Sequence, residues 1–339
     1  MSATMRAFVI DGKLDASIQS LPVPEPQADE VRIRIAYVGV CGSDLHYYFD
    51  GANGAFVVKE PLIPGHELSG TIDLDPSGEF ASGTAVTVHP GRFGISEPGI
   101  EDKRHLWPGG SYLGSASTWP HTQGAMSDYL LVKKFMVRAL PAGLSLKDAA
   151  LAEPLGVAVH AANVYGDLAG KRVLVSGSGP IGLLVAALAH YNGAAEVTST
   201  DVLTGPLERA KSMGADKTIQ ITSEALPENY YDVVFECSAS PIAVSSAFVA
   251  VRRAGTVIQV GILGAGPQPI AIAALVSKEI TLKGAFRFNN EVEDAVKLLL
   301  QSDKFSLCIT HILKPDDAVE AFEIAKNSQI SGKVLIDFQ

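Results

Sequence analysis

Over the first ninety residues, hydrophobic positions alternate with polar ones in short runs, the pattern of β-strands that bury one face. Turns rich in Gly, Pro and Asp, such as residues 21–30, separate the runs. The expected strands lie at 5–10, 31–40, 69–74 and 83–89. This part of the chain is therefore expected to form a β-rich domain of short strands.

After residue 166 the pattern changes to strand-like apolar runs that alternate with helix-like stretches. The expected strands lie at 171–177, 196–201, 231–237, 255–261 and 279–286. The expected helices lie at 181–193, 206–214 and 241–255, and each ends at a glycine suited to the left-handed position after a helix. Strand and helix in repeated alternation predict a doubly wound parallel sheet, so the fold class is α/β.

The remaining segments complete a two-domain arrangement. Residues 89–126 show little periodicity and are expected to form a long excursion, and loops of such length are usually functional. The last part has expected helices at 291–303 and 315–328 and a strand at 332–338, and is expected to fold back on the first domain. We therefore expect a β-rich domain at 1–154 and 291–339 and a doubly wound domain at 155–290, which fits a length of 339 residues.

Composition and charge narrow the class of protein. With 47% apolar and 19% charged residues, the chain has ample material for buried cores. A formal charge of -10 has the wrong sign for binding nucleic acid. Three scattered cysteines do not make a disulfide framework, and no apolar run approaches the roughly 18 residues of a membrane span. A cytoplasmic protein without membrane or nucleic-acid partners is expected.

A dinucleotide-binding motif opens the second half. Gly177, Gly179 and Gly182 form G-x-G-x-x-G between an expected strand and an expected helix, with Pro180 and Ile181 inside the motif. Such glycines let a pyrophosphate approach backbone N–H groups at the helix N-terminus. The alternative is a tight turn that uses glycine for backbone reasons alone. The order of strand, glycines, helix and strand favours the nucleotide site.

Asp201 ends the next strand, 19 residues after Gly182. Its carboxylate would accept hydrogen bonds from ribose hydroxyls and repel a 2′-phosphate, and 202–206 contain no Arg or Lys, so NAD is favoured over NADP. Asp201 as a simple helix cap is the alternative. The ends of the fourth and fifth strands are expected to flank adenine and nicotinamide respectively, through Cys237 and through Val260, Gly261 and Ile262.

A second group of residues has the chemistry of a metal site. Cys41, His66, Glu67 and Glu153 each lie in a turn-like setting, and a thiolate, an imidazole and carboxylates suit zinc. Taken singly, a cysteine is usually a small buried apolar residue and a glutamate is usually solvated. The nucleotide motif favours the metal reading, because hydride removal from a secondary alcohol requires an acidified hydroxyl, which zinc supplies.

Four segments together carry a family resemblance: VGVCGSDLHYY at 38–48, PGHELSG at 64–70, AEPLGVAVHA at 152–161 and SGSGPIG at 176–182. The chain resembles the zinc-containing medium-chain alcohol and polyol dehydrogenases over essentially its whole length. The resemblance implies a Rossmann nucleotide domain, a GroES-like catalytic domain, and homodimers or homotetramers. It also implies hydride transfer between NAD(P) and a secondary hydroxyl of a polyol or sugar acid, with L-idonate expected first and sorbitol, xylitol or galactitol as alternatives.

The resemblance also implies individual roles. Cys41 and His66 match zinc ligands, Glu67 matches the third ligand of the polyol enzymes, and Glu153 matches an acid that approaches the metal or its water. Ser43 resembles the hydroxyl that accepts the alcohol proton, and His46 the imidazole that passes it to solvent, for which a histidine pKa near ~6.5 is suited.

Four further residues have candidate roles in the site. Asp44 matches an acid that holds a zinc histidine, and Arg287 matches an arginine at the polyol site. Tyr47 and Trp119 are candidates for lining the substrate pocket. The alternatives are turn chemistry in the CGSD loop, a surface charge at Arg287 and local packing of the aromatic residues.

Two departures from the family matter. Family members often hold a second, structural zinc with four cysteines, but this chain has no cysteine between Gly91 and Gly124, and His105 and His121 cannot replace such a site. One zinc per chain is therefore expected. Phe288 stands where sorbitol-type enzymes tend to have tyrosine, which weakens the case for sorbitol. Two rivals remain open: a zinc-free quinone or enone reductase, and a nucleotide-binding protein without activity.

Overall fold

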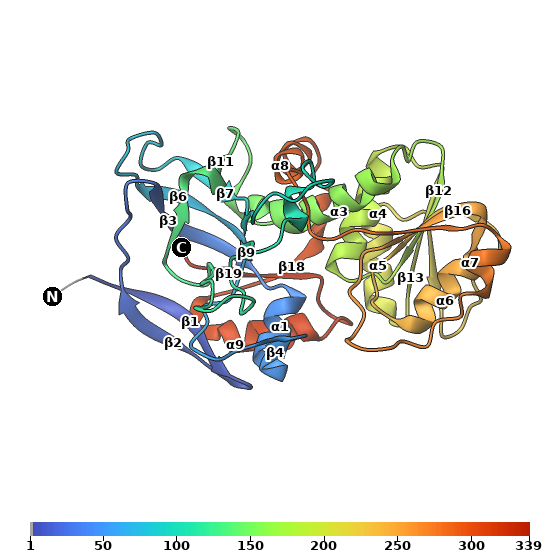
Figure 1. Cartoon of the computed structure of the whole chain (residues 1–339), viewed down its shortest axis with the longest axis horizontal. Helices are drawn as coiled ribbons and strands as arrows, with labels where there is room; N and C mark the ends of the chain where they lie inside the picture. Colours follow the sequence, from blue (N-terminus) through green and yellow to red (C-terminus); the bar gives the residue numbers. More distant parts are fainter. Residues whose placement is uncertain (1–2) are drawn as a thin grey trace.

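The computed structural model describes residues 3–339. Its two main sheets lie toward opposite ends of an elongated molecule, and helix α3 (Ala152–Tyr165) runs between them (Figure 1). One sheet is mixed and is built from both ends of the sequence, whereas the other is entirely parallel. The α/β class and the two kinds of sheet agree with the expectation from the sequence.

The mixed sheet has seven strands in the order β11-β7-β6-β3-β19-β18, with β10 also paired to β3. Its strands are β3 (Glu30–Gly39), β6 (Glu67–Leu74), β7 (Ala85–Val88), β10 (Tyr129–Lys133), β11 (Val137–Ala139), β18 (Ile309–Leu313) and β19 (Lys333–Asp337). The hairpin of β1 (Thr4–Gly12) and β2 (Asp15–Pro22), helix α1 (Gly42–Asp50) and helix α9 (Ala318–Lys326) pack into the same hydrophobic core. This core contains the alternate apolar residues of β3 that the sequence pattern predicted, such as Val31, Ile33 and Ile35.

The parallel sheet has six strands in the order β14-β13-β12-β15-β16-β17. The strands are β12 (Arg172–Ser176), β13 (Glu196–Asp201), β14 (Lys217–Gln220), β15 (Tyr231–Glu236), β16 (Val251–Gln259) and β17 (Thr281–Gly284). Helices α4 (Pro180–Tyr191), α5 (Thr204–Met213), α6 (Pro241–Ala250) and α7 (Ala273–Ser277) connect them. Numbered from β12, the order is 3-2-1-4-5-6, which is the doubly wound arrangement that binds dinucleotides where the strand order reverses.

Short elements fill the connections. They are β4 (Ala52–Asn53), β5 (Phe56–Val57), β8 (Gly91–Arg92), β9 (Ser111–Tyr112) and α2 (Leu146–Ala149), with single 3₁₀ turns at η1 (Arg104–Leu106), η2 (Lys134–Met136), η3 (Phe305–Cys308) and η4 (Pro315–Asp317). Residues 89–126 contain β8, η1 and β9 and otherwise consist of turns, which matches the expected long excursion. Within residues 3–339, no helix is long and apolar enough to cross a membrane.

The structure corrects one expected helix and its end. The helix expected at 241–255 stops at Ala250, and residues 251–259 continue as β16. Gly255 therefore lies in a strand and is not among the left-handed glycines, unlike Gly193 and Gly214 after the preceding helices. The physical reason is that Val251 pairs with Tyr231 in the sheet and is fully buried there, so tertiary contacts override the helical pattern.

The C-terminal segment divides between the two cores. Strands β18 and β19 join the mixed sheet, with Leu335 opposite Gly39 of β3. Helix α8 (Val292–Gln301), which the expected division placed with the β-rich domain, instead packs beside α3 in the core of the parallel-sheet half. The chain therefore returns to the mixed sheet near β18, and not at residue 291; the boundary between 154 and 155 stays a prediction.

Candidate metal centre and nucleotide site

Cys41, His66 and Glu67 converge at one end of the mixed sheet. Cys41 directly precedes α1, and Glu67 begins β6 opposite Gly39 of β3. One ligand atom from each of the three side chains lies within 4.8 Å of those of the other two. Residues that are far apart in the sequence are thus brought to one point by the pairing of β3 with β6.

His66 Nδ1 is buried without a hydrogen-bond partner, whereas Glu67 Oε2, also without a hydrogen bond, lies 2.7 Å from the Lys333 ammonium. Buried polar atoms are nearly always paired, so the His66 nitrogen in particular is suited to ligating a cation. Burial lowers the pKa of His66, but the nearby Cys41 and Asp44 outweigh it and raise that pKa to about 10. A divalent ion bound by a thiolate, an imidazole and a carboxylate would displace this proton and leave one tetrahedral position open.

Asp44 is fully buried next to the cluster, and its carboxylate binds backbone N–H groups. Its carboxylate accepts hydrogen bonds from the N–H groups of Cys41 (3.0 Å) and Gly65 (3.1 Å). Both hydrogen bonds of the Asp44 carboxylate go to backbone N–H groups and not to the His66 ring, so the expectation that Asp44 holds the imidazole directly is corrected. It instead joins the two turns that carry the thiol and the imidazole, because each turn has a free N–H aimed at it.

Glu153 lies in the first turn of α3, buried beside the cluster, and burial raises its pKa. The Tyr112 hydroxyl donates a hydrogen bond of 2.6 Å to it, and the Tyr112 ring lies 5.4 Å from that of His66. The Arg287 guanidinium lies 4.0 Å from the centre of the Tyr112 ring. Arg287 has a backbone φ of 51°, which is uncommon for a residue other than glycine and occurs often at functional sites.

Ser43 and His46 lie one turn apart on α1, the helix that begins directly after Cys41. His46 is exposed, and its Nδ1 lies 2.9 Å from Asp50 Oδ2. This hydrogen bond lowers the pKa of Asp50. Ser43 and His46 share a helix face but make no hydrogen bond to each other, so a proton relay through them requires a bridging hydroxyl or water.

The glycine motif forms the turn between β12 and α4. Gly177 has a φ of 90°, and a Cβ on Gly182 would lie 1.9 Å from the Gly177 carbonyl oxygen, so both positions require glycine. Nothing lies within 4 Å of a Cβ built on Gly179, at the N-terminus of α4, where Pro180 and Ile181 follow in its first turn. The turn therefore leaves open space in front of backbone N–H groups, as a pyrophosphate requires.

A cavity of about 730 Å³ extends from this turn along the ends of the parallel strands. Asp201 and Cys237 line it together with Gly177 and Gly179. The Asp201 carboxylate accepts hydrogen bonds from the N–H groups of Ser178 and Leu203, both at 3.0 Å, which fixes it at the mouth. Val260, Gly261 and Ile262 line a separate hollow of about 890 Å³, together with Ala285 and Phe286.

Tyr47 and Trp119, the two aromatic candidates for the substrate pocket, lie in a buried core and in a surface hollow respectively. Tyr47 is buried in the core of the mixed-sheet half, and its hydroxyl bonds to Ser115 (3.2 Å) and the Ala116 N–H (3.1 Å). Trp119 is 67% exposed and lines a surface hollow with His121. Tyr47 therefore anchors the 111–122 loop.

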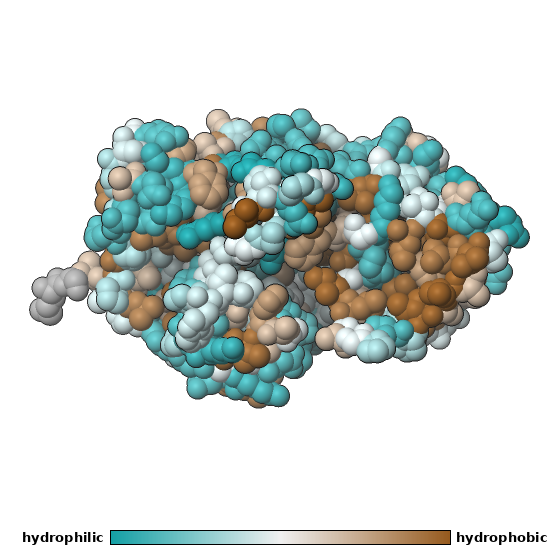
Figure 2. Space-filling view, viewed as in Figure 1, coloured by the Kyte–Doolittle hydropathy of each residue, from teal (hydrophilic) through white to brown (hydrophobic). Residues whose placement is uncertain are grey.

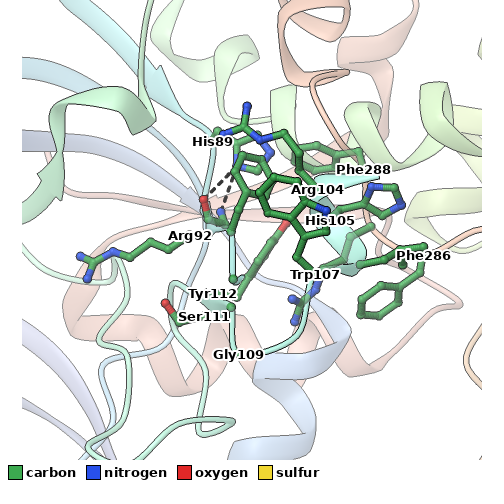
Figure 3. Close-up of a pocket in the computed structure, with 16 residues that line it drawn as sticks. His89, Arg92, Arg104, His105, Trp107, Gly109, Ser111, Tyr112, Phe286 and Phe288 are labelled. Atoms are coloured by element: carbon green, nitrogen blue, oxygen red, sulfur yellow. Dashed lines mark hydrogen bonds between the residues drawn. The ribbon is translucent and has the colours of Figure 1, made fainter. Parts of the chain in front are cut away.

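The cysteine-free segment at 91–110 is held by aromatic and cationic side chains (Figure 3). The Arg104 guanidinium lies 4.1 Å from the centre of the Phe93 ring and 5.9 Å from that of Trp107. Trp107 Nε1 donates to the Ile100 carbonyl at 2.9 Å, and β8 pairs with β9. His105 packs against His160, with ring centres 4.7 Å apart, and lines the cavity of about 260 Å³ shown in Figure 3.

Sequence reasoning missed Tyr112 and Lys333. Tyr112 lies in an aperiodic loop, and only the fold brings its hydroxyl to Glu153. Lys333 begins β19 and contacts Glu67 at 2.7 Å, and it is almost fully buried. A lysine that leads directly into the apolar run VLI was the one available signal.

Comparisons with known proteins agree with this arrangement. Residues 27–142 match the family model of the alcohol dehydrogenase GroES-like domain, and residues 180–301 match that of the zinc-binding dehydrogenases. The chain is 35% identical to L-idonate 5-dehydrogenase (NAD(P)(+)) of Escherichia coli, over 100% of both chains. It is 32% identical to the sorbitol dehydrogenase of Macaca fascicularis, over 94% of this chain and 92% of that one.

The fold comparison gives the same result. The crystal structure of L-idonate 5-dehydrogenase from Escherichia coli superposes with a TM-score of 0.92, at 31% identity over 99% of each chain.

Proposed function

Because the chain belongs to the zinc-binding dehydrogenase family, we propose that it oxidises a secondary hydroxyl of a polyol or sugar acid, with NAD as the hydride acceptor. L-idonate is the first candidate substrate, since the idonate enzyme is similar over the whole chain. The observation that carries the proposal is the convergence of Cys41, His66 and Glu67, with a buried His66 Nδ1 that has no hydrogen-bond partner within residues 3–339.

The residues around the cluster have distinct tasks in this proposal. Cys41, His66 and Glu67 would hold a zinc ion that would supply Lewis acidity toward the substrate hydroxyl, and the bound dinucleotide would supply the hydride acceptor. Ser43 takes the hydroxyl proton, and His46 releases it to solvent with Asp50 beside it.

The other groups orient the substrate. Glu153, held by Tyr112, stays buried at the back of the site. Arg287 is free of ion pairs within residues 3–339, so its guanidinium is available to a substrate carboxylate or hydroxyl. A carboxylate pairs with a guanidinium through two parallel hydrogen bonds, which favours a sugar acid. Phe288 is fully buried and offers no hydroxyl, which does not support sorbitol.

The choice of NAD rests on the fixed carboxylate of Asp201. A 2′-phosphate at this position would meet a negative charge, with no Arg or Lys in 202–206 to compensate it. One zinc per chain is proposed because 91–124 has no cysteine and is held by the stacked Arg104, Phe93 and Trp107.

A homo-oligomer in the cytoplasm is also part of the proposal. Strand β17 is an edge of the parallel sheet, and all four of its residues are exposed. Exposed apolar side chains gather on this half of the molecule, as Figure 2 shows over α6 and α7. They include Ile242, Ile262, Ile272, Val276 and Leu282. An uncovered edge with apolar neighbours is suited to pairing with a second copy.

The test combines metal analysis with steady-state kinetics. L-idonate, sorbitol, xylitol and galactitol are each assayed with NAD and with NADP. Bound zinc with turnover supports the proposal, turnover without zinc supports a quinone-reductase-like enzyme, and the absence of both supports a protein without activity. A Cys41→Ser variant that kept both zinc and full turnover would contradict the ligand assignment.

A further inference from the structure

A buried ion pair lies behind the metal cluster. The Lys333 side chain is 3% exposed and that of Glu67 1%, with 2.7 Å between the ammonium and the carboxylate. Lys333 Nζ donates to Glu67 Oε1 and also to the Val40 carbonyl oxygen at 3.1 Å. The other carboxylate oxygen, Oε2, also lies 2.7 Å from the ammonium and makes no further hydrogen bond within residues 3–339. One lysine ammonium thus contacts both oxygens of a carboxylate that belongs to the metal cluster.

The strand order places this ion pair beside Gly39, which has no side chain. Gly39 of β3 lies opposite Glu67 on β6 and opposite Leu335 on β19, so β3 separates the two charged residues. A Cβ on Gly39 would lie 2.1 Å from Glu67 Oε2. The Glu67 carboxylate therefore occupies the space that a larger residue would fill, and reaches across β3 to Lys333.

The charges explain why a lysine is needed there. Acidic groups crowd this point, because Cys41, Asp44, Glu67 and Glu153 all surround His66. Lys333 is the only buried lysine or arginine between residues 3 and 339. A buried carboxylate without a partner is costly, so it tends to turn away toward solvent or another donor.

We propose that Lys333 is a positioning residue of the metal site, which acts across the gap at Gly39 to hold the Glu67 carboxylate in a fixed orientation at the metal ion. This inference rests on the proposed function, in which Glu67 binds the metal. Partners that orient a ligand typically contribute ten- to a hundredfold to metal affinity, about the effect expected here.

Three variants test the inference, Lys333→Met, Lys333→Arg and Gly39→Ala. Zinc affinity is measured by competition with a chelator, and the cobalt-substituted protein is compared by its visible absorption spectrum, which reports the coordination geometry. Lys333→Met is expected to weaken zinc binding at least tenfold and to change the cobalt spectrum. Lys333→Arg restores most of both, whereas Gly39→Ala reproduces the spectral change with the lysine intact.

Matched controls separate positioning from loss of a charge or of a glycine. Lys314→Met removes an exposed lysine that pairs with Asp337 in the same sheet, and Gly12→Ala adds a methyl group in open space. Both are expected to keep the affinity and spectrum of the wild type. If Lys333→Met does not fold, the other two variants carry the test, since neither removes the positive charge.

A wild-type cobalt spectrum together with unchanged or tighter zinc binding in Lys333→Met, or in Gly39→Ala if the former does not fold, overturns the inference. Failure of the wild type itself to bind zinc contradicts the proposed function instead, so the two failures are distinguishable.

Discussion

At the scale of single residues, the carboxylate of Asp201 has two tasks that one substitution can separate. It accepts hydrogen bonds from the N–H groups of Ser178 and Leu203, and in the proposed function it binds the adenosine ribose of NAD. Asp201→Asn keeps an acceptor oxygen but removes the charge. We expect the ratio of kcat/KM for NAD to that for NADP to fall at least tenfold, because hydrogen bonds to charged groups contribute about 1.5–3 kcal/mol.

The measurement is steady-state kinetics with both dinucleotides on wild type and variant, with thermal unfolding as a check on the fold. A wild type that already prefers NADP, or a variant with an unchanged ratio, would refute the role of the charge.

Glu291 is the residue that makes acid stability predictable. Burial opposes its charge, but His160 at 2.8 Å and the N–H groups of Asn289 and Asn290 hold its pKa at about 2. This pKa lies below the ordinary value of 4.5, so the carboxylate stabilises the fold above pH 4.5, and the stabilisation disappears as the pH falls toward 2.

We therefore expect the unfolding free energy of the wild type to exceed that of Glu291→Gln by about 2 kcal/mol at pH 6, with most of this difference gone at pH 2. Urea titrations across this range measure it. Glu320→Gln, an exposed glutamate on α9, is the control and should show no such trend. A constant difference between wild type and Glu291→Gln at all pH values would argue against the linkage.

At the scale of elements, Trp107 is expected to hold the segment at 91–110 in place of a bound ion. It contacts Arg104 and donates to the Ile100 carbonyl. We expect Trp107→Ala to destabilise the protein by about 2–3 kcal/mol and to speed proteolytic cleavage within 91–110, because the change removes both packing and a hydrogen bond.

The chain offers a matched control, since Trp119 is its only other tryptophan. That side chain is 67% exposed, so Trp119→Ala should leave both stability and cleavage nearly unchanged. Equal cleavage of the two variants would show that the stacked side chains do not support the segment.

The elements also show where sequence reasoning works. The strands of the parallel sheet were predictable because their apolar runs are buried on both faces, as at 172–176. The edge strand β14 was missed, since its four residues are all exposed or half-buried and carry no pattern. Helix α6 was extended too far, because the burial of Val251 comes from a strand pairing that the sequence does not display.

The residues of the site likewise divide into those that the sequence predicts and those whose contacts only the fold creates. Cys41, His66 and Glu67 could be proposed from residue type and turn setting, and the structure brings them together. The contacts of Asp44 with backbone N–H groups, of Tyr112 with Glu153 and of Lys333 with Glu67 depend on chain segments that only folding brings together. Partners at long range leave no periodic trace in a single sequence.

At the scale of the whole molecule, assembly is expected to depend on the edge of the parallel sheet. Leu282 is 46% exposed on β17, and a lysine there would place a charge in any contact between two copies. We expect Leu282→Lys to weaken self-association at least tenfold, as measured by sedimentation velocity over a range of concentrations.

Ile95→Lys is the comparison, because Ile95 is 79% exposed in the 91–110 segment, far from β17 in the sequence. It should associate like the wild type. A monomeric wild type, or a Leu282→Lys variant that associates normally, would rule out this edge as the interface.

The contact between Glu67 and Lys333 can form only late in biosynthesis. These partners are 266 positions apart, and β19 lies inside the mixed sheet between β3 and β18. At roughly 5–20 residues per second, a ribosome needs between about 13 and 53 seconds to add that length. During that interval the nascent polypeptide holds its cysteine and histidine without the lysine, so the proposed zinc site is complete only after the β19 segment has left the ribosome.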